Sequence, residues 1–91
     1  MVTQVKTKKE IASMREAGRQ LATVLQILKS RIEVGMSTKA LADIAADELK
    51  KLGGKPSFLG YQGFPDVICI SVNDEVVHGI PRATKILNDG D

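Results

Sequence analysis

The chain has 91 residues, of which 43% are hydrophobic and 26% charged. These values fit one small domain over residues 1–91 and exclude a multidomain or a disordered protein. Its single cysteine and single histidine exclude an internal disulfide and a metal site with two histidine ligands. The net charge of +2 is unevenly distributed, because residues 1–31 carry seven basic and two acidic side chains and the rest carries six and nine.

The amino terminus is polar and basic, and no stretch reaches the roughly 18 consecutive apolar residues of a membrane helix. We therefore expect a cytoplasmic protein with neither a membrane nor a DNA partner. The basic first third indicates either a solvated helix face or contact with an anionic partner such as ribosomal RNA.

A first helix is predicted to begin near Lys8, because Thr7 and Glu10 have the spacing of a capping box. Its apolar positions recur every three or four residues and so share one stripe of the helix. This stripe contains Ile11, Met14, Gly18, Leu21, Leu25 and Leu28. A glycine costs a helix about 1 kcal/mol relative to alanine, so Gly18 predicts the close approach of another backbone.

A second helix is predicted after Ser37, which suits an N-cap position, and it ends at Gly53-Gly54. Its apolar face combines Leu41, Ile44, Ala45, Leu49 and Leu52. Two amphipathic helices joined by a short turn should pack against each other or on a sheet.

The segment 55–66, KPSFLGYQGFPD, holds all three aromatic side chains of the protein: Phe58, Tyr61 and Phe64. Such a segment between prolines and glycines forms either a lid over the core or the wall of an apolar pocket.

Two short β-type runs, 67–72 and 75–79, flank Asn73-Asp74 and predict an antiparallel hairpin. A loop with an even number of residues places Cys69, Ser71 and His78 on one face, and an odd loop separates them. The expected fold class is therefore α+β, with two amphipathic helices packed on a β-hairpin. An isolated hairpin is marginally stable in water, so we expect this chain to be a truncated piece of a longer protein.

His78 is the only side chain whose unperturbed pKa lies near neutrality, and it ends a predicted strand. It is either catalytic or simply hydrogen-bonded within the hairpin. Cys69 opposite it suggests a nucleophilic Cys-His pair, but its apolar neighbours favour an inert thiol. The acidic side chains of the second helix (Asp43, Asp47 and Glu48) favour a solvated face over a cation site.

The run at residues 60–81, GYQGFPDVICISVNDEVVHGIP, closely resembles the amino-terminal part of type I methionine aminopeptidases. The preceding helices and the closing LNDGD fit the same family. The resemblance implies the amino-terminal half of a pita-bread fold, whose halves hold a pair of divalent metal ions (Co, Mn, Fe or Zn). Enzymes of this family remove the amino-terminal methionine from nascent proteins by attack of a metal-activated water.

The resemblance also assigns roles to particular residues. His78 corresponds to a catalytic residue that hydrogen-bonds the scissile amide of the substrate. Phe58, Tyr61, Phe64 and Cys69, together with His78, correspond to positions that line the pocket for the methionine side chain. Phe58 and Phe64 stand where bacterial relatives often carry Cys and Tyr, so the pocket loses a hydroxyl group.

The metal ligands of the family, which are Asp, His and Glu side chains, would all lie beyond Asp91. We therefore expect no metal ligand in this chain and no activity from it alone, and we expect its partner to be the amino terminus of a peptide or nascent protein. Two alternatives stay open. One is a non-catalytic half-domain that binds a peptide or partner protein and self-associates through bare apolar faces. The other is a module that contacts the ribosome or RNA through its basic first helix.

Overall fold

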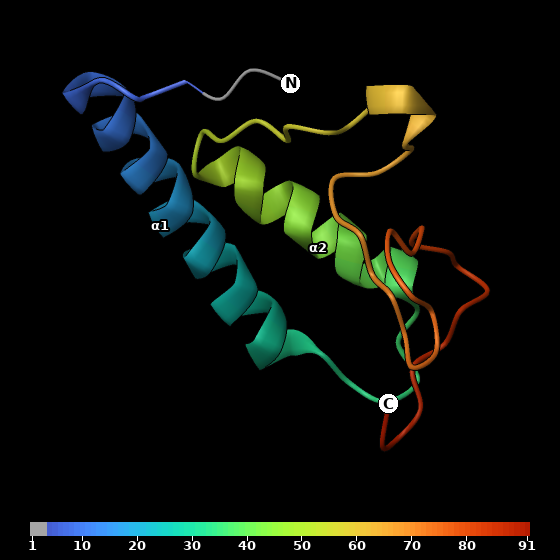
Figure 1. Ribbon diagram of the computed structural model, residues 1–91. Helices are drawn as coiled ribbons and strands as arrows, with labels where there is room; N and C mark the ends of the chain where they lie inside the picture. The colour runs from blue at the N-terminus through green and yellow to red at the C-terminus, as the bar shows by residue number, and fades with distance from the viewer. Residues whose placement is uncertain (1–3) are drawn as a thin grey trace.

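The computed structural model describes residues 4–91, which form two α-helices followed by a long irregular segment (Figure 1). Helix α1 spans Lys8–Arg31 and helix α2 spans Thr38–Lys51. A single 3-10 turn, η1, covers Tyr61–Gly63. Both predicted helices are confirmed.

Side-chain caps begin both helices where the sequence predicts them. The Thr7 hydroxyl accepts a hydrogen bond from the Glu10 backbone N–H at 3.1 Å, and the Glu10 carboxylate accepts one from the Thr7 N–H at 3.0 Å. At the start of α2, the Ser37 hydroxyl accepts a hydrogen bond from the Ala40 N–H at 3.0 Å. These bonds satisfy backbone donors that have no partner within the helix.

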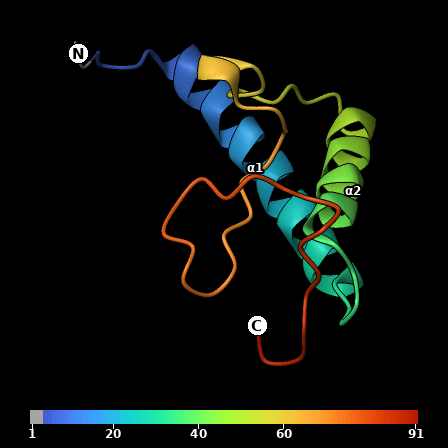
Figure 2. The same ribbon diagram turned by 90° about the vertical axis from the view of Figure 1, so that its right-hand side faces the viewer.

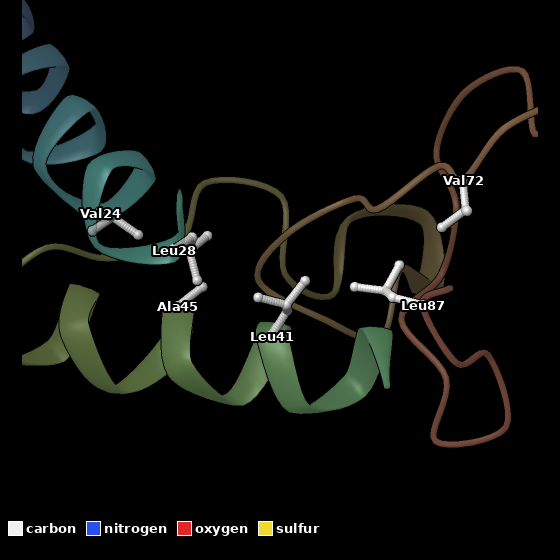
Figure 3. Packing of buried hydrophobic residues seen from close by; sticks show 6 residues of the cluster. All are labelled: Val24, Leu28, Leu41, Ala45, Val72 and Leu87. Carbon is white, nitrogen blue, oxygen red and sulfur yellow. The ribbon is translucent and has the colours of Figure 1, made fainter. Parts of the chain in front are cut away.

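The two helices run antiparallel and enclose the core between them. At one end, the Gln20 side-chain amide donates to the Leu52 carbonyl at 3.2 Å. Further along, Val24 and Leu28 of α1 face Ala45 and Leu41 of α2, as Figure 3 shows. The irregular segment completes this buried cluster with Val72 and Leu87.

Most of the predicted apolar stripe of α1 is exposed. Ile11, Met14, Leu21 and Leu25 are 46%, 58%, 57% and 51% exposed, and only Leu28 of the stripe is buried. Among the described residues, no heavy atom lies within 4 Å of a Cβ placed on Gly18, so the prediction of a close backbone approach there is wrong for this chain. The physical reason is that α2 covers only the carboxy-terminal half of α1, and there it covers the side of Val24 and Leu28 and leaves Leu21 and Leu25 exposed.

The chain is less compact than its length allows. Its radius of gyration is 15.0 Å, whereas a compact domain of this length has about 12 Å. The long axis measures 44 Å against 28 and 22 Å for the others. The amino-terminal half of α1 therefore projects away from the core.

The predicted β-hairpin is wrong, because the structure has no strand within residues 4–91. The chain does reverse direction, and the Ile70 N–H donates to the Gly79 carbonyl at 2.8 Å, in the register of a four-residue loop. Side chains take the donors that a ladder needs, since the Val72 N–H donates to the Glu75 carboxylate and the Gly79 N–H to the Ser71 hydroxyl. The result is an irregular loop at one side of the helix pair, orange in Figure 2.

The carboxy-terminal segment returns to the turn between the helices (Figure 1). Ser37 and Ile86 form an antiparallel bridge, and the Leu87 N–H donates to the Met36 carbonyl at 2.8 Å. No helix among residues 4–91 is long and apolar enough to cross a membrane.

Candidate functional site

All five side chains that the sequence singles out for substrate contact meet at one pocket of about 540 Å³. The aromatic segment forms one wall, and the stretch that contains His78 forms the other. The lining residues are Phe58, Tyr61, Gln62, Gly63, Phe64, Pro65, Cys69, His78 and Ile80.

The aromatic wall is shaped by a tight reversal of the chain. Gly60 has φ of 80°, a left-handed conformation that glycine adopts without steric cost. The Gly60 N–H donates to the Phe64 carbonyl at 2.8 Å. As a result, the rings of Phe58 and Phe64 meet edge to face, with centroids 5.4 Å apart and planes at 82°. Tyr61 between them is 67% exposed, so this segment is a pocket wall and not a closed lid.

The opposite wall depends on close contact between two backbone segments. A Cβ on Gly79 would lie 2.1 Å from the Ile70 carbonyl oxygen, so only glycine fits there. His78, directly before it, has φ of 53°, a left-handed conformation that is uncommon for side chains other than glycine and is often found at functional sites. The Ser71 hydroxyl accepts a hydrogen bond from the Gly79 N–H at 3.0 Å and holds this turn in place.

The imidazole of His78 and the thiol of Cys69 are neighbours in the lining of the pocket. The Sγ to Nδ1 distance is 3.8 Å, which is a weak contact. A loop with an even number of residues was predicted to place Cys69 and His78 on the same face. The two side chains do lie together, although the hairpin itself is absent. His78 is exposed and Cys69 is half-buried, so the thiol is more accessible than the sequence suggests.

Two ion pairs flank the pocket. The Lys39 ammonium lies 2.8 Å from the Asp66 carboxylate, and this hydrogen bond raises the pKa of Lys39 above its ordinary value. The Arg82 guanidinium lies 3.3 Å from the Glu75 carboxylate. The first pair ties Asp66, which follows the pocket residue Pro65, to the first turn of α2, and the second links two residues of the irregular segment.

The described part of the chain has no group of three His, Cys, Asp or Glu side chains that could hold a metal ion. Asp43 and Asp47 lie on an exposed face of α2 and pair with lysines of the same helix, Asp43 with Lys39 at 3.5 Å and Asp47 with Lys51 at 3.1 Å. Glu48 is buried, and its carboxylate lies 3.4 Å from Lys51 and 3.7 Å from Arg31. The prediction of a solvated position is therefore wrong for Glu48.

Four lining residues were not predicted as site residues: Gln62, Gly63, Pro65 and Ile80. All four lie inside the two sequence motifs that carry the family resemblance, GYQGFP and HGIP. Their position next to Tyr61, Phe64 and His78 in the sequence is the signal that would have found them.

Known proteins confirm the resemblance. Residues 12–91 match the model of metallopeptidase family M24. The chain belongs to this family. It is 52% identical over 86 residues to methionine aminopeptidase 1 of Bacillus subtilis, covering 94% of this chain and 34% of that relative. It is 40% identical over 97 residues to methionine aminopeptidase of Aquifex aeolicus, covering all of this chain and 38% of the relative.

Solved structures of methionine aminopeptidases match this M24 chain closely. The enzyme from Thermotoga maritima superposes with a TM-score of 0.94 at 37% identity, and the enzyme from Rickettsia prowazekii with 0.91 at 33%. Each match covers 99% of this chain and 36% of the other. The fold is therefore that of one part of the pita-bread fold, and the chain spans about a third of the length of the relatives it matches.

Proposed function

We propose that this chain supplies the methionine-binding pocket and a substrate-contacting histidine to a cytoplasmic methionine aminopeptidase, which acts on the amino termini of nascent proteins. One observation carries the proposal: Phe58, Tyr61, Phe64, Cys69 and His78 line a single pocket. The similarity to methionine aminopeptidases from Bacillus subtilis and Thermotoga maritima supports it.

The chemistry of the pocket suits a methionine side chain. A thioether gains favourable contacts from aromatic rings, and its unbranched chain fits an irregular apolar slot. Phe58 and Phe64 provide two such rings, set edge to face. Neither contributes a hydroxyl group, so these two rings select by shape and polarizability, and Tyr61 carries the one phenolic hydroxyl of the wall.

In this proposal, His78 holds the scissile amide at the mouth of the pocket. A neutral imidazole has one nitrogen that donates a hydrogen bond and one that accepts a hydrogen bond. The left-handed backbone at His78 and the close approach of Gly79 to Ile70 fix the direction from which the ring reaches the substrate. A preorganised hydrogen bond of this kind stabilises charge that develops during peptide hydrolysis.

The metal ions of an M24 peptidase need ligands from outside this chain, because residues 4–91 contain no group suited to hold one. We therefore expect no hydrolysis by the 91-residue chain alone. The test is a chimera in which residues 1–91 replace the matching part of Bacillus subtilis methionine aminopeptidase 1. With Co²⁺ or Mn²⁺ added, the chimera should cleave a Met-Ala-Ser peptide, and the isolated chain should not.

Within the chimera, His78→Ala should lower kcat/KM by about 100-fold, the typical effect of losing one transition-state hydrogen-bond donor. Val76→Ala is the matched control, since Val76 lies on the same loop but is 89% exposed and does not line the pocket. Full activity of the His78 variant, or turnover by the isolated chain, would contradict the proposal.

A second candidate function, a non-catalytic half-domain that pairs with another copy of itself, is favoured by the exposed apolar stripe of α1. Leu21 and Leu25 are 57% and 51% exposed, and neighbouring apolar surface of this kind favours association. Sedimentation equilibrium should then show dimers that Leu25→Gln weakens and Arg15→Gln does not. A strict monomer at high concentration rules this candidate out.

A further inference from the structure

Both walls of the pocket are tied to the first turn of α2 by two consecutive residues. Thr38 accepts a hydrogen bond on its hydroxyl oxygen from the Arg82 N–H at 2.8 Å, and Arg82 follows the His78 wall. Lys39 contacts Asp66 through its ammonium group at 2.8 Å, and Asp66 follows the aromatic wall. The start of α2 is therefore a common anchor for two segments that the sequence separates.

The Asp66 link is an ion pair with a buried acidic partner. The side chain of Asp66 is 8% exposed, and that of Lys39 is 44% exposed. One carboxylate oxygen faces Lys39, and the other accepts a hydrogen bond from the Val67 N–H at 2.8 Å. Lys39 provides the one ion pair that Asp66 makes within residues 4–91. A buried carboxylate that loses its cation is destabilised strongly. Without the Lys39 ammonium, the segment 65–67 should therefore shift until the Asp66 carboxylate reaches solvent.

Asp66 adjoins Pro65, which lines the pocket, so any shift of Asp66 moves the end of the aromatic wall. The His78 wall does not depend on this ion pair, because Arg82 is held by the Thr38 hydroxyl and by the backbone N–H of Lys39, which donates to the Arg82 carbonyl at 3.3 Å. Loss of the ion pair therefore changes the spacing between the walls without releasing the histidine.

We propose that Lys39 and Asp66 are positioning residues, which hold the aromatic wall at the distance from His78 that admits an unbranched side chain. The proposal rests on the proposed function for the identity of that side chain, and on the structure alone for the position of the wall.

The position of the wall can be measured without any activity, because Cys69 lines the pocket and is the only cysteine of the chain. The rate of its alkylation by iodoacetamide reports how open the pocket is. Lys39→Met leaves the Asp66 carboxylate buried without its cation and should raise this rate by about tenfold, the ratio that corresponds to about 1.4 kcal/mol. Asp66→Asn removes the buried charge together with the ion pair and should raise the rate less. The double variant should react no faster than Lys39→Met, since it no longer contains the unpaired carboxylate.

Asp43→Asn is the matched control, because Asp43 also faces Lys39, at 3.5 Å, but is 68% exposed and lies on α2 itself. Its rate should equal that of the wild type, and Lys39→Arg, which keeps the cation, should stay close to it. Far-UV circular dichroism measures the helix content of each variant independently of the alkylation rate. If Asp66→Asn lowers the helical signal, Lys39→Met decides the test. Unchanged alkylation in Lys39→Met, or additive effects in the double variant, would overturn the proposal.

The effect of the ion pair on substrate binding is tested with the chimera described above. Lys39→Met should raise KM for the Met-Ala-Ser peptide by about tenfold while kcat stays near the wild-type value, because the wall moves and the histidine does not. An equal fall in kcat would overturn the positioning role. If the chimera itself is inactive, the proposed function fails, and the alkylation rates still decide whether the ion pair places the wall.

Discussion

Gly79→Ala is the substitution for which the structure predicts the largest local effect. The added Cβ would lie 2.1 Å from the Ile70 oxygen, 2.7 Å from the Ile70 carbonyl carbon and 2.9 Å from the Ser71 Cα. All three atoms belong to the backbone, so no side chain can rotate away. Reaching even the 3.0 Å limit of real Cβ contacts requires the two segments to separate by about 0.9 Å.

The cost follows from this separation. Forced overpacking costs about 1–3 kcal/mol, and the hydrogen bond from the Ile70 N–H to the Gly79 carbonyl, now 2.8 Å, would be lost at about 1 kcal/mol. The strain falls on the turn that carries His78, because the helices lie elsewhere. We therefore expect His78 to leave its left-handed conformation and its contact with Cys69.

The assay uses the fact that His78 is the only histidine, so its imidazole proton signals in NMR spectra are assigned directly. In Gly79→Ala these signals should shift, and the nuclear Overhauser effects between the His78 ring and Cys69 should vanish. The urea midpoint measured from the imidazole signals should be lower than the midpoint measured from the helical signal. Gly18→Ala is the matched control. No described heavy atom lies within 4 Å of its Cβ position, and alanine should stabilise α1 by about 0.5–1 kcal/mol. Unchanged imidazole signals in Gly79→Ala would refute the steric argument.

Two further predictions concern the helix caps. Ser37→Ala should lower the free energy of unfolding by about 1 kcal/mol in urea titrations, whereas Ser13→Ala, at an exposed position of α1, should not lower it; equal losses would contradict the capping role. The backbone and hydroxyl hydrogen bonds of Thr7 hold the pKa of Glu10 below its ordinary value, so the ionised carboxylate stabilises α1 above the ordinary carboxyl range. That contribution is lost as the pH falls through the lowered pKa, and the difference in helicity between wild type and Glu10→Gln, measured by circular dichroism, should disappear in acid. A difference that persists there would contradict this assignment.

The two helices follow from signals that are local in the sequence. Caps at Thr7 and Ser37 act within one helical turn, and the apolar spacing follows from the pitch of the helix. Both helices therefore begin where the pattern predicts. Motif resemblance led to the candidate site in the same way, since most of its lining residues lie in the runs GYQGFP and HGIP, and only Phe58 and Cys69 lie outside them.

The remaining features depend on packing and on side-chain hydrogen bonds that periodicity does not describe. Apolar spacing in 67–79 favours a hairpin, yet the carboxylate of Glu75 and the hydroxyl of Ser71 take backbone donors that strands would need. The stripe of α1 predicts burial, but whether a face is covered depends on a second surface that periodicity does not describe. The pairing of Lys39 with Asp66 joins residues 27 positions apart, and no local pattern shows such a contact. Local propensity selects helices, whereas long-range packing decides which donors, faces and charges find partners.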